Sequence, residues 1–241
     1  MRSRGLATAN APQGPYARSL RRLHLAIAIL VSVLAVTGFM IYFRKPLGLQ
    51  EFKLTLVFAH AIVAYVFLAI LVARAYLGFR GAENVRFRHT LPRMNDLRQL
   101  FHLQGSARSR LKFAGRSPFS RAIAGILYAT IAMNAATGLV RAGTDLYFPP
   151  FGPVIRGFVA ADGVDPALVK PADKSRVDAA RFGVVSKAKV PFGKIHIYGA
   201  FIIATIALFH ATGVAATEWS APNNPNARGR ARLMLFGSRR P

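Results

Sequence analysis

The 241-residue chain contains no cysteine. This absence excludes disulfides, thiolate zinc sites, iron–sulfur clusters held by this chain, and c-type haem attached through a CxxCH motif. Acidic residues are also scarce, 9 against 33 lysines and arginines, and Arg74 is the one charged residue inside the long apolar runs. A metal bound within those runs must therefore take its protein ligands from histidine.

The composition is typical of a membrane protein, because 53% of the residues are hydrophobic and only 17% are charged. Alternation of apolar and polar residues is missing, which argues against a β-barrel. Four apolar runs are long enough to cross about 30 Å of hydrocarbon as helices. We therefore expect an all-α bundle of four transmembrane helices, with spans at about 20–43, 54–79, 119–141 and 194–217. The first run is too long for the apolar region of a signal peptide, so we expect a retained helix.

The net charge of +24 favours anionic lipid headgroups over nucleic acid, because the basic residues flank the apolar runs. On one side lie 20 basic and 3 acidic residues, in segments 1–22, 80–121 and 218–241. On the other side lie 12 basic and 6 acidic residues, in segments 44–53 and 141–194. This bias predicts that both termini face the cytoplasm, and we expect the chain in a cytoplasmic membrane.

The predicted organisation is one membrane domain, residues 1–218, followed by a basic cytoplasmic tail, 219–241. The outer connection, 141–193, is long and carries proline and glycine in "YFPPFGP". Such punctuation indicates turns, so we expect this connection to form a small cap on the outer face.

Four of the six histidines lie inside the predicted spans: His24, His60, His196 and His210. Strongly polar groups in a span are costly and are usually functional, although any one of them can be explained by an interhelical hydrogen bond. Since successive helices alternate in direction, His60 and His196 fall near the outer face, and His24 and His210 near the inner face. His89 and His102 lie in the basic inner loop and receive no role.

The spacing of the two histidines in the last span indicates how they are used. Fourteen residues separate His196 from His210, which advances a helix by about 21 Å and turns it through nearly four full turns. The two imidazoles therefore face almost the same way at two depths. One helix can offer a ligand to each of two stacked sites, with His60 and His24 opposing them.

Two opposed imidazoles in an apolar slot suit haem better than zinc. Zinc requires four ligands or an open water position, whereas porphyrin supplies four nitrogens and leaves two axial positions. Iron with both axial positions filled by histidine cycles between Fe(II) and Fe(III), which predicts an electron carrier. Glycines that permit close backbone approach recur near these levels, at Gly38, Gly125, Gly138, Gly199 and Gly213. Small-residue helix packing is the other reading of these glycines.

Two further polar residues lie within the spans. Arg74 follows His60 by fourteen residues, so it can pair with a haem propionate or extend to the lipid headgroups, the latter being slightly favoured. Asn134 can bond a quinone carbonyl or a neighbouring helix, and the neighbouring helix is the simpler explanation.

This pattern resembles the bacterial cytochrome b561 group, in particular the di-haem cytochrome b subunits of membrane-bound nickel–iron hydrogenases and formate dehydrogenases. The resemblance rests on one histidine in each of the first two helices and two, fourteen apart, in the fourth. The stretch "KFAGRSPFSRAIAG", 112–125, is similar to a Gly-His-Asn-Pro-Leu-Gly segment of that family, with Arg116 and Ser117 in place of its His-Asn pair.

The resemblance implies two non-covalent b haems, one held by His24 and His210 and the other by His60 and His196. It also implies a quinone site near the cytoplasmic haem and a redox partner docked outside. The expected function is therefore electron transfer in a respiratory chain, between the quinone pool and a periplasmic or membrane-bound partner such as a hydrogenase, a dehydrogenase or a c-type cytochrome.

Two other functions remain open on the sequence. The chain can be a free-standing quinone oxidoreductase, for example one that oxidises superoxide at its basic outer face. It can also be a cation transporter without haem, although the scarcity of carboxylates in the spans argues against that class. Whether the chain is itself an enzyme or a subunit of an oxidoreductase complex is left open by these patterns.

Overall fold

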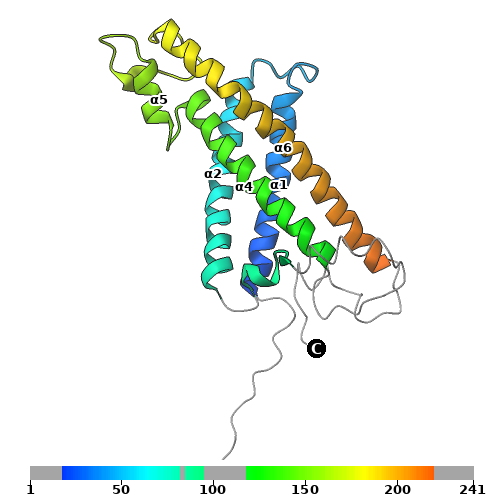
Figure 1. Ribbon diagram of the computed structural model, residues 1–241. Coiled ribbons are helices and arrows are strands. Elements are labelled where there is room, and N and C mark those ends of the chain that lie inside the picture. The colour runs from blue at the N-terminus through cyan, green and yellow to red at the C-terminus, as the bar shows by residue number, and fades with distance from the viewer. Residues whose placement is uncertain (1–17, 82–84, 95–117, 220–241) are drawn as a thin grey trace, which may run out of the picture.

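Four long helices run side by side through the computed structural model, which describes residues 18–81, 85–94 and 118–219 (Figure 1). They are α1 (Arg18–Tyr42), α2 (Lys53–Arg80), α4 (Pro118–Leu146) and α6 (Ala179–Trp219). Each is long and apolar enough to cross a membrane. The prediction of an all-α protein with four transmembrane helices is confirmed.

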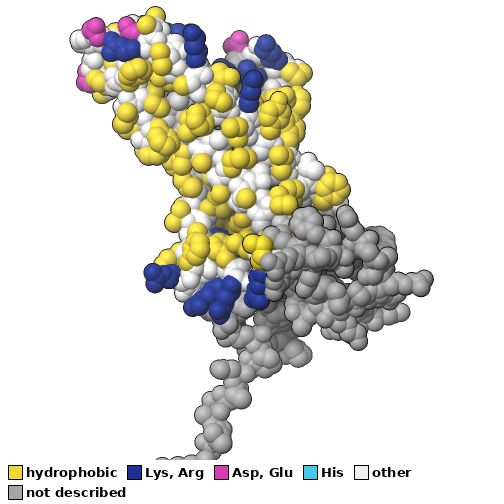
Figure 2. All heavy atoms as spheres, viewed as in Figure 1, with side chains coloured by type: hydrophobic (Ala, Val, Ile, Leu, Met, Phe, Trp, Pro, Cys, Tyr) yellow, Lys and Arg dark blue, Asp and Glu magenta, His cyan; other side chains and the backbone are white. Residues whose placement is uncertain are grey.

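The surface of the bundle has the polarity of a membrane protein. Figure 2 shows hydrophobic side chains over the middle of one face, with lysine and arginine at both ends. Large apolar residues of the long helices are exposed, including Val36, Val72 and Leu208 at 59%, 61% and 65%. Exposed apolar side chains along helices of this length are typical of a bundle that lies in lipid.

The helices are arranged as two hairpins. α1 packs mainly on α2, and α4 packs mainly on α6. Between the hairpins lies an apolar core formed by Phe67 of α2, Ile131 of α4 and Ile203 of α6. Phe67 follows His60 by seven residues, and Ile203 stands midway between His196 and His210. The core therefore fills the bundle between the two predicted histidine levels.

Short-range signals explain where the first helices end. α1 stops before a turn that contains Pro46 and Gly48, and Gly48 adopts a φ of 68°, which favours glycine. α2 ends at Gly81, whose backbone N–H donates to the carbonyl of Leu77 at 3.0 Å. After α2, the short 3₁₀ helix η2 (Phe87–His89) lies at the end of the bundle that the charge bias predicts to face the cytoplasm; this end is termed inner and the opposite end outer.

The outer connection folds into a small cap with its own core. The cap contains α5 (Gly152–Val159) and the 3₁₀ helix η4 (Pro166–Leu168), and its buried residues are Tyr147, Val159, Ala160 and Val169. The Tyr65 hydroxyl of α2 donates to the carbonyl of Pro149, which attaches the cap to the bundle. The cap is therefore packed on the helices that carry the outer histidines.

Helix α6 begins well before the apolar span predicted at 194–217. The carboxylate of Asp178 accepts the backbone N–H of Arg181 at 2.8 Å, which caps the start of the helix. This backbone donor holds the pKa of Asp178 below its ordinary value. At about 1.5 Å per residue, the 41 residues of α6 are longer than the hydrocarbon layer requires. Its first turns therefore belong to the outer cap.

Candidate cofactor site

The four histidines of the spans meet as two pairs. The ring centres of His24 on α1 and His210 on α6 are 6.2 Å apart, with planes inclined at 61°. The ring centres of His60 on α2 and His196 on α6 are 6.4 Å apart, with planes inclined at 88°. Each pair joins one hairpin of the bundle to the other. These are the same two pairs that helix direction and the fourteen-residue spacing predict.

Both separations suit a metal held between two imidazole nitrogens. A nitrogen ligand lies about 2 Å from its metal and about 1 Å from the centre of its own ring, so opposed rings on one metal have centres about 6 Å apart. Among the described residues, no cluster of three or more His, Cys, Asp or Glu is placed to hold a metal ion. The pairs therefore fit a metal whose remaining ligands come from a cofactor.

The hydrogen bonds of the outer pair leave the ligating nitrogens available. His196 Nδ1 lies 3.1 Å from the backbone oxygen of Asn134, which can only accept, so Nδ1 carries the hydrogen. The Thr37 hydroxyl donates to the Val33 carbonyl at 2.9 Å, and its oxygen lies 2.8 Å from His60 Nδ1. With the Thr37 hydrogen directed to Val33, the hydroxyl oxygen can accept from His60 Nδ1–H. In both rings Nε2 is left with a lone pair for a metal.

Threonine side chains beside the outer pair are residues that sequence reasoning missed. Thr137 Oγ1 lies 3.3 Å from His196 Nδ1, as Thr37 Oγ1 lies close to His60 Nδ1. Each threonine directly precedes a glycine, in "VTGF" and "ATGL". Thr-Gly pairs are the signal that was present in the sequence, although a third pair, Thr212-Gly213, lies in α6 beside His210 and not beside the outer pair.

The glycines after these threonines make room for the histidine rings. A Cβ atom at Gly138 would lie 3.1 Å from His196 Cε1, and one at Gly38 would lie 3.5 Å from His60 Cε1. The close backbone approach expected at these two glycines is therefore an approach to the rings of the candidate ligands His60 and His196. At Gly199 a Cβ would meet the Asn134 amide oxygen at 2.5 Å, and at Gly125 it would meet Pro92 Cδ at 2.9 Å. These two glycines serve packing between segments.

No described atom lies within 4 Å of a Cβ built at Gly213, so the contacts give that glycine no packing role. The side chain of Asn134 packs against α6 at Gly199. His102 and the segment 112–117 lie outside the described residues.

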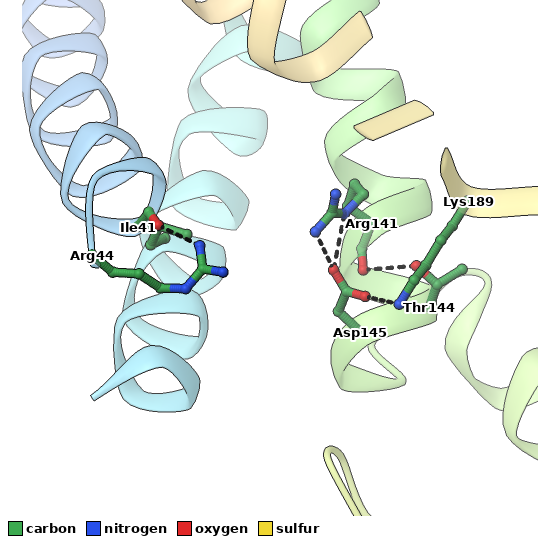
Figure 3. Close-up of polar contacts among 6 residues, drawn as sticks. All are labelled: Ile41, Arg44, Arg141, Thr144, Asp145 and Lys189. Atoms are coloured by element: carbon green, nitrogen blue, oxygen red, sulfur yellow. Dashed lines mark hydrogen bonds and ion pairs between the residues drawn. The ribbon is translucent and has the colours of Figure 1, made fainter. Parts of the chain in front are cut away.

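An ionic cluster ties α4 to α6 at the outer end of the bundle (Figure 3). Asp145 of α4 binds Arg141 at 2.6 Å and Lys189 of α6 at 2.7 Å. Arg141 lies one turn from Thr137 along α4, so the cluster stands directly outside the His196 level. In the same view, Arg44 donates to the carbonyl of Ile41 at the end of α1. Basic side chains of α1, α4 and α6 thus lie at the outer end of the bundle.

Arg74 is a buried charged residue in the inner half of α2. Arg74 of α2 is 2% exposed, and its Nε donates to the Tyr128 hydroxyl of α4 at 3.0 Å. The slightly favoured prediction that Arg74 extends to the lipid headgroups is therefore wrong. Tyr128 from α4 and Phe87 from η2 cover the Arg74 guanidinium, and neither contact could be predicted from the sequence of α2.

Comparison with protein families matches residues 15–223 to the prokaryotic cytochrome b561 family. Comparison with curated proteins and with solved structures found no match. The family match spans all four long helices and both histidine pairs. Its members are membrane cytochromes that transfer electrons through b-type haem. This multi-pass membrane protein therefore belongs to the prokaryotic cytochrome b561 family.

Proposed function

We propose that the chain carries electrons across the membrane through two b haems, one on each histidine pair. His24 and His210 hold the inner haem, and His60 and His196 hold the outer haem. The observation that carries this proposal is the meeting of the imidazoles at 6.2 and 6.4 Å from separate helices. When bound, haem iron supplies one-electron chemistry by cycling between Fe(II) and Fe(III).

The protein's own residues give this cofactor its restricted chemistry. Two histidines would hold the iron of each haem from opposite sides, which would leave no site on the iron for oxygen or a substrate. Hydrogen bonds from Nδ1 of His60 and His196 fix the orientation of both outer ligands and raise their basicity. The apolar core at Phe67, Ile131 and Ile203 excludes water between the two levels. Such a site passes electrons and does no bond chemistry itself.

The ends of the pathway lie at opposite faces. His196 and His210 are fourteen residues apart on α6, so the two levels are separated by about 21 Å along the helix. We assign the inner level to exchange with membrane quinone. We assign the outer level to a periplasmic or membrane-bound redox partner, of the hydrogenase, dehydrogenase or c-type cytochrome class. The outer cap, packed on α2 and continuous with α6, is the surface available to that partner.

Electron flow across the membrane can be measured in sealed lipid vesicles. Purified protein is placed in quinone-free vesicles that enclose ferricyanide, and dithionite is added outside. We expect the enclosed ferricyanide to be reduced much faster than in protein-free vesicles. His60→Ala is expected to return the rate towards that of protein-free vesicles, because the outer haem then lacks an axial ligand. A wild-type rate equal to that of empty vesicles contradicts the proposal.

Two additions to this assay separate the possible partners. A quinol added to the oxidised protein is expected to reduce its haems, and absence of that reduction contradicts the quinone assignment. Haem reduction by enzymatically generated superoxide, without any partner protein, would instead favour a free-standing superoxide:quinone oxidoreductase.

The threonine contacts to the outer ligands predict a change that is confined to one haem. In Thr37→Val the His60 Nδ1–H loses its acceptor, so the imidazole becomes a weaker donor to iron. We expect a higher midpoint potential for the outer haem and a haem affinity lower by about 10-fold or more. Redox titration of the α-band spectrum measures the potential, and haem transfer to apomyoglobin measures the affinity.

The matched control for Thr37→Val is Thr130→Val. Thr130 is buried in α4, and its hydroxyl donates to the carbonyl of Ile126 in its own helix at 2.8 Å. Both haems of Thr130→Val are expected to keep the wild-type potentials. Equal shifts in the two variants would show that the effect comes from helix packing and not from the His60 contact.

A further inference from the structure

Arg74 is a buried cation whose position is fixed by two other elements. Its side chain is among the largest that are fully buried, with 2% of the residue exposed. Its Nε donates to Tyr128 at 3.0 Å, and its guanidinium carbon lies 4.5 Å from the centre of the Phe87 ring. Cation–π contact and this hydrogen bond orient the guanidinium, but they supply no negative charge.

The two terminal nitrogens of Arg74 face no partner in the described part of the chain. Both Nη1 and Nη2 are buried there without a hydrogen bond. A buried guanidinium that lacks an anion is strongly destabilising, since arginine cannot lose its proton. Its planar pair of N–H donors matches the two oxygens of a carboxylate or a phosphate. The geometry therefore calls for an oxyanion at this point.

The described carboxylates are not placed to supply that oxyanion. The six whose side chains the structure describes belong to the outer turns, the outer end of α4 or the cap, whereas Arg74 lies towards the inner end of α2. They are Glu51, Asp145, Asp162, Asp165, Asp173 and Asp178. The side chains of Glu83, Asp96 and Glu218 lie outside the described part of the chain, so the experiment includes all three.

Three helices place Arg74 at the level of the inner histidine pair. Arg74 follows His60 by fourteen residues, as His210 follows His196. On α1, Gly38 borders the His60 ring, and His24 lies fourteen residues before Gly38. Each offset equals about 21 Å and nearly four full turns. Arg74 therefore leaves α2 on nearly the same side as His60, at the depth of His24 and His210.

We propose that Arg74 is a cofactor-binding residue that pairs with a propionate carboxylate of the inner haem. This inference rests on the proposed function, because it requires a haem on His24 and His210. The haem carries the carboxylates that this level of the bundle lacks among the described residues. Tyr128 holds the guanidinium in position for the contact. A lipid phosphate would satisfy the same donors, and the experiment separates the two sources.

The first arm of the experiment removes the charge. Arg74→Gln is compared with Arg80→Gln, which removes an exposed arginine from the last turn of the same helix. Loss of a positive charge beside the haem favours Fe(III). We therefore expect Arg74→Gln to lower the midpoint potential of the inner haem and to leave that of the outer haem unchanged. Titration in a His60→Ala background, which keeps only the inner haem, assigns the shift. Arg80→Gln is expected to move neither potential.

A conservative variant keeps this arm decisive. Arg74→Lys retains the charge and is expected to restore most of the potential, whereas a purely structural role for Arg74 would leave both variants alike. Retention of the outer haem in Arg74→Gln shows that the bundle has folded. If the haems are present and Arg74→Gln moves neither potential, or moves both equally, the inference is overturned. If wild-type protein binds no haem, the proposed function itself fails.

The second arm identifies the oxyanion. Wild type and Arg74→Gln are reconstituted with haem whose two propionates are methyl esters. We expect the Arg74→Gln shift with this haem to differ from the shift with natural haem, because an ester cannot form an ion pair with Arg74. An Arg74→Gln shift that is the same with both haems assigns the oxyanion to lipid phosphate or to a side chain and overturns the inference. Glu83→Gln, Asp96→Asn or Glu218→Gln would overturn it too, by reproducing the Arg74→Gln shift and abolishing the effect of adding that substitution.

Discussion

Replacing His60 or His196 with alanine is expected to remove one of two b haems and to leave the other in place. Each histidine faces its partner across the bundle at 6.4 Å between ring centres, and a haem left with one axial ligand is held weakly. Haem content should fall from about two to about one per chain in both variants. His24→Ala and His210→Ala should remove the other haem, because these rings form the second pair.

The pattern of loss is more informative than the loss alone. Redox titration should show that His60→Ala and His196→Ala lack the same component, and that His24→Ala and His210→Ala lack the other. His89→Ala and His102→Ala are the matched controls, since these histidines lie outside the spans, and they should keep both haems. Crossed losses, with His60 grouped with His24, would contradict the pairing.

Replacing Gly138 with leucine is expected to eliminate the outer haem without altering any ligand. A Cβ at this position lies 3.1 Å from His196 Cε1, which is already tight, and the leucine branches would enter the space of the ring. Overpacking of this kind commonly lowers the free energy of unfolding by about 1–3 kcal/mol. At this position we expect the His196 ring to move in order to relieve the clash. The inner haem should remain, and pyridine haemochrome assay with redox titration measures both.

Graded substitutions test that steric explanation. Gly38→Ala should be tolerated, because its Cβ would lie at an ordinary 3.5 Å from His60 Cε1, whereas Gly138→Ala should weaken outer haem binding. Gly183→Leu in α6 is the control, since no described atom lies within 4 Å of its Cβ position. If Gly138→Leu retains both haems with unchanged potentials, the His196 ring is not held where we place it.

Hydropathy and residue spacing predicted the features that depend on long periodic segments. The four helices follow from apolar runs that are long enough to cross hydrocarbon. The meeting of His60 with His196, and of His24 with His210, follows from alternating helix direction and from a fourteen-residue step that nearly completes four turns. Neither argument requires knowledge of side-chain packing.

Features that depend on packing between elements were not predictable. For Arg74, extension to the lipid headgroups was slightly favoured over pairing with a haem propionate. The structure instead buries Arg74 against Tyr128 of α4 and Phe87 of η2. Thr37 and Thr137 reach histidines on other helices, which only a known helix rotation reveals. The early start of α6 depends on capping by Asp178 in a segment without a strong apolar signal.

The haem content and spectrum of the purified wild-type protein test the central claim most directly. Protein expressed with adequate haem supply should contain about two b haems per chain, both low-spin with two imidazole ligands by electron paramagnetic resonance. A colourless protein, or one whose haem is high-spin with an open axial position, would contradict the account.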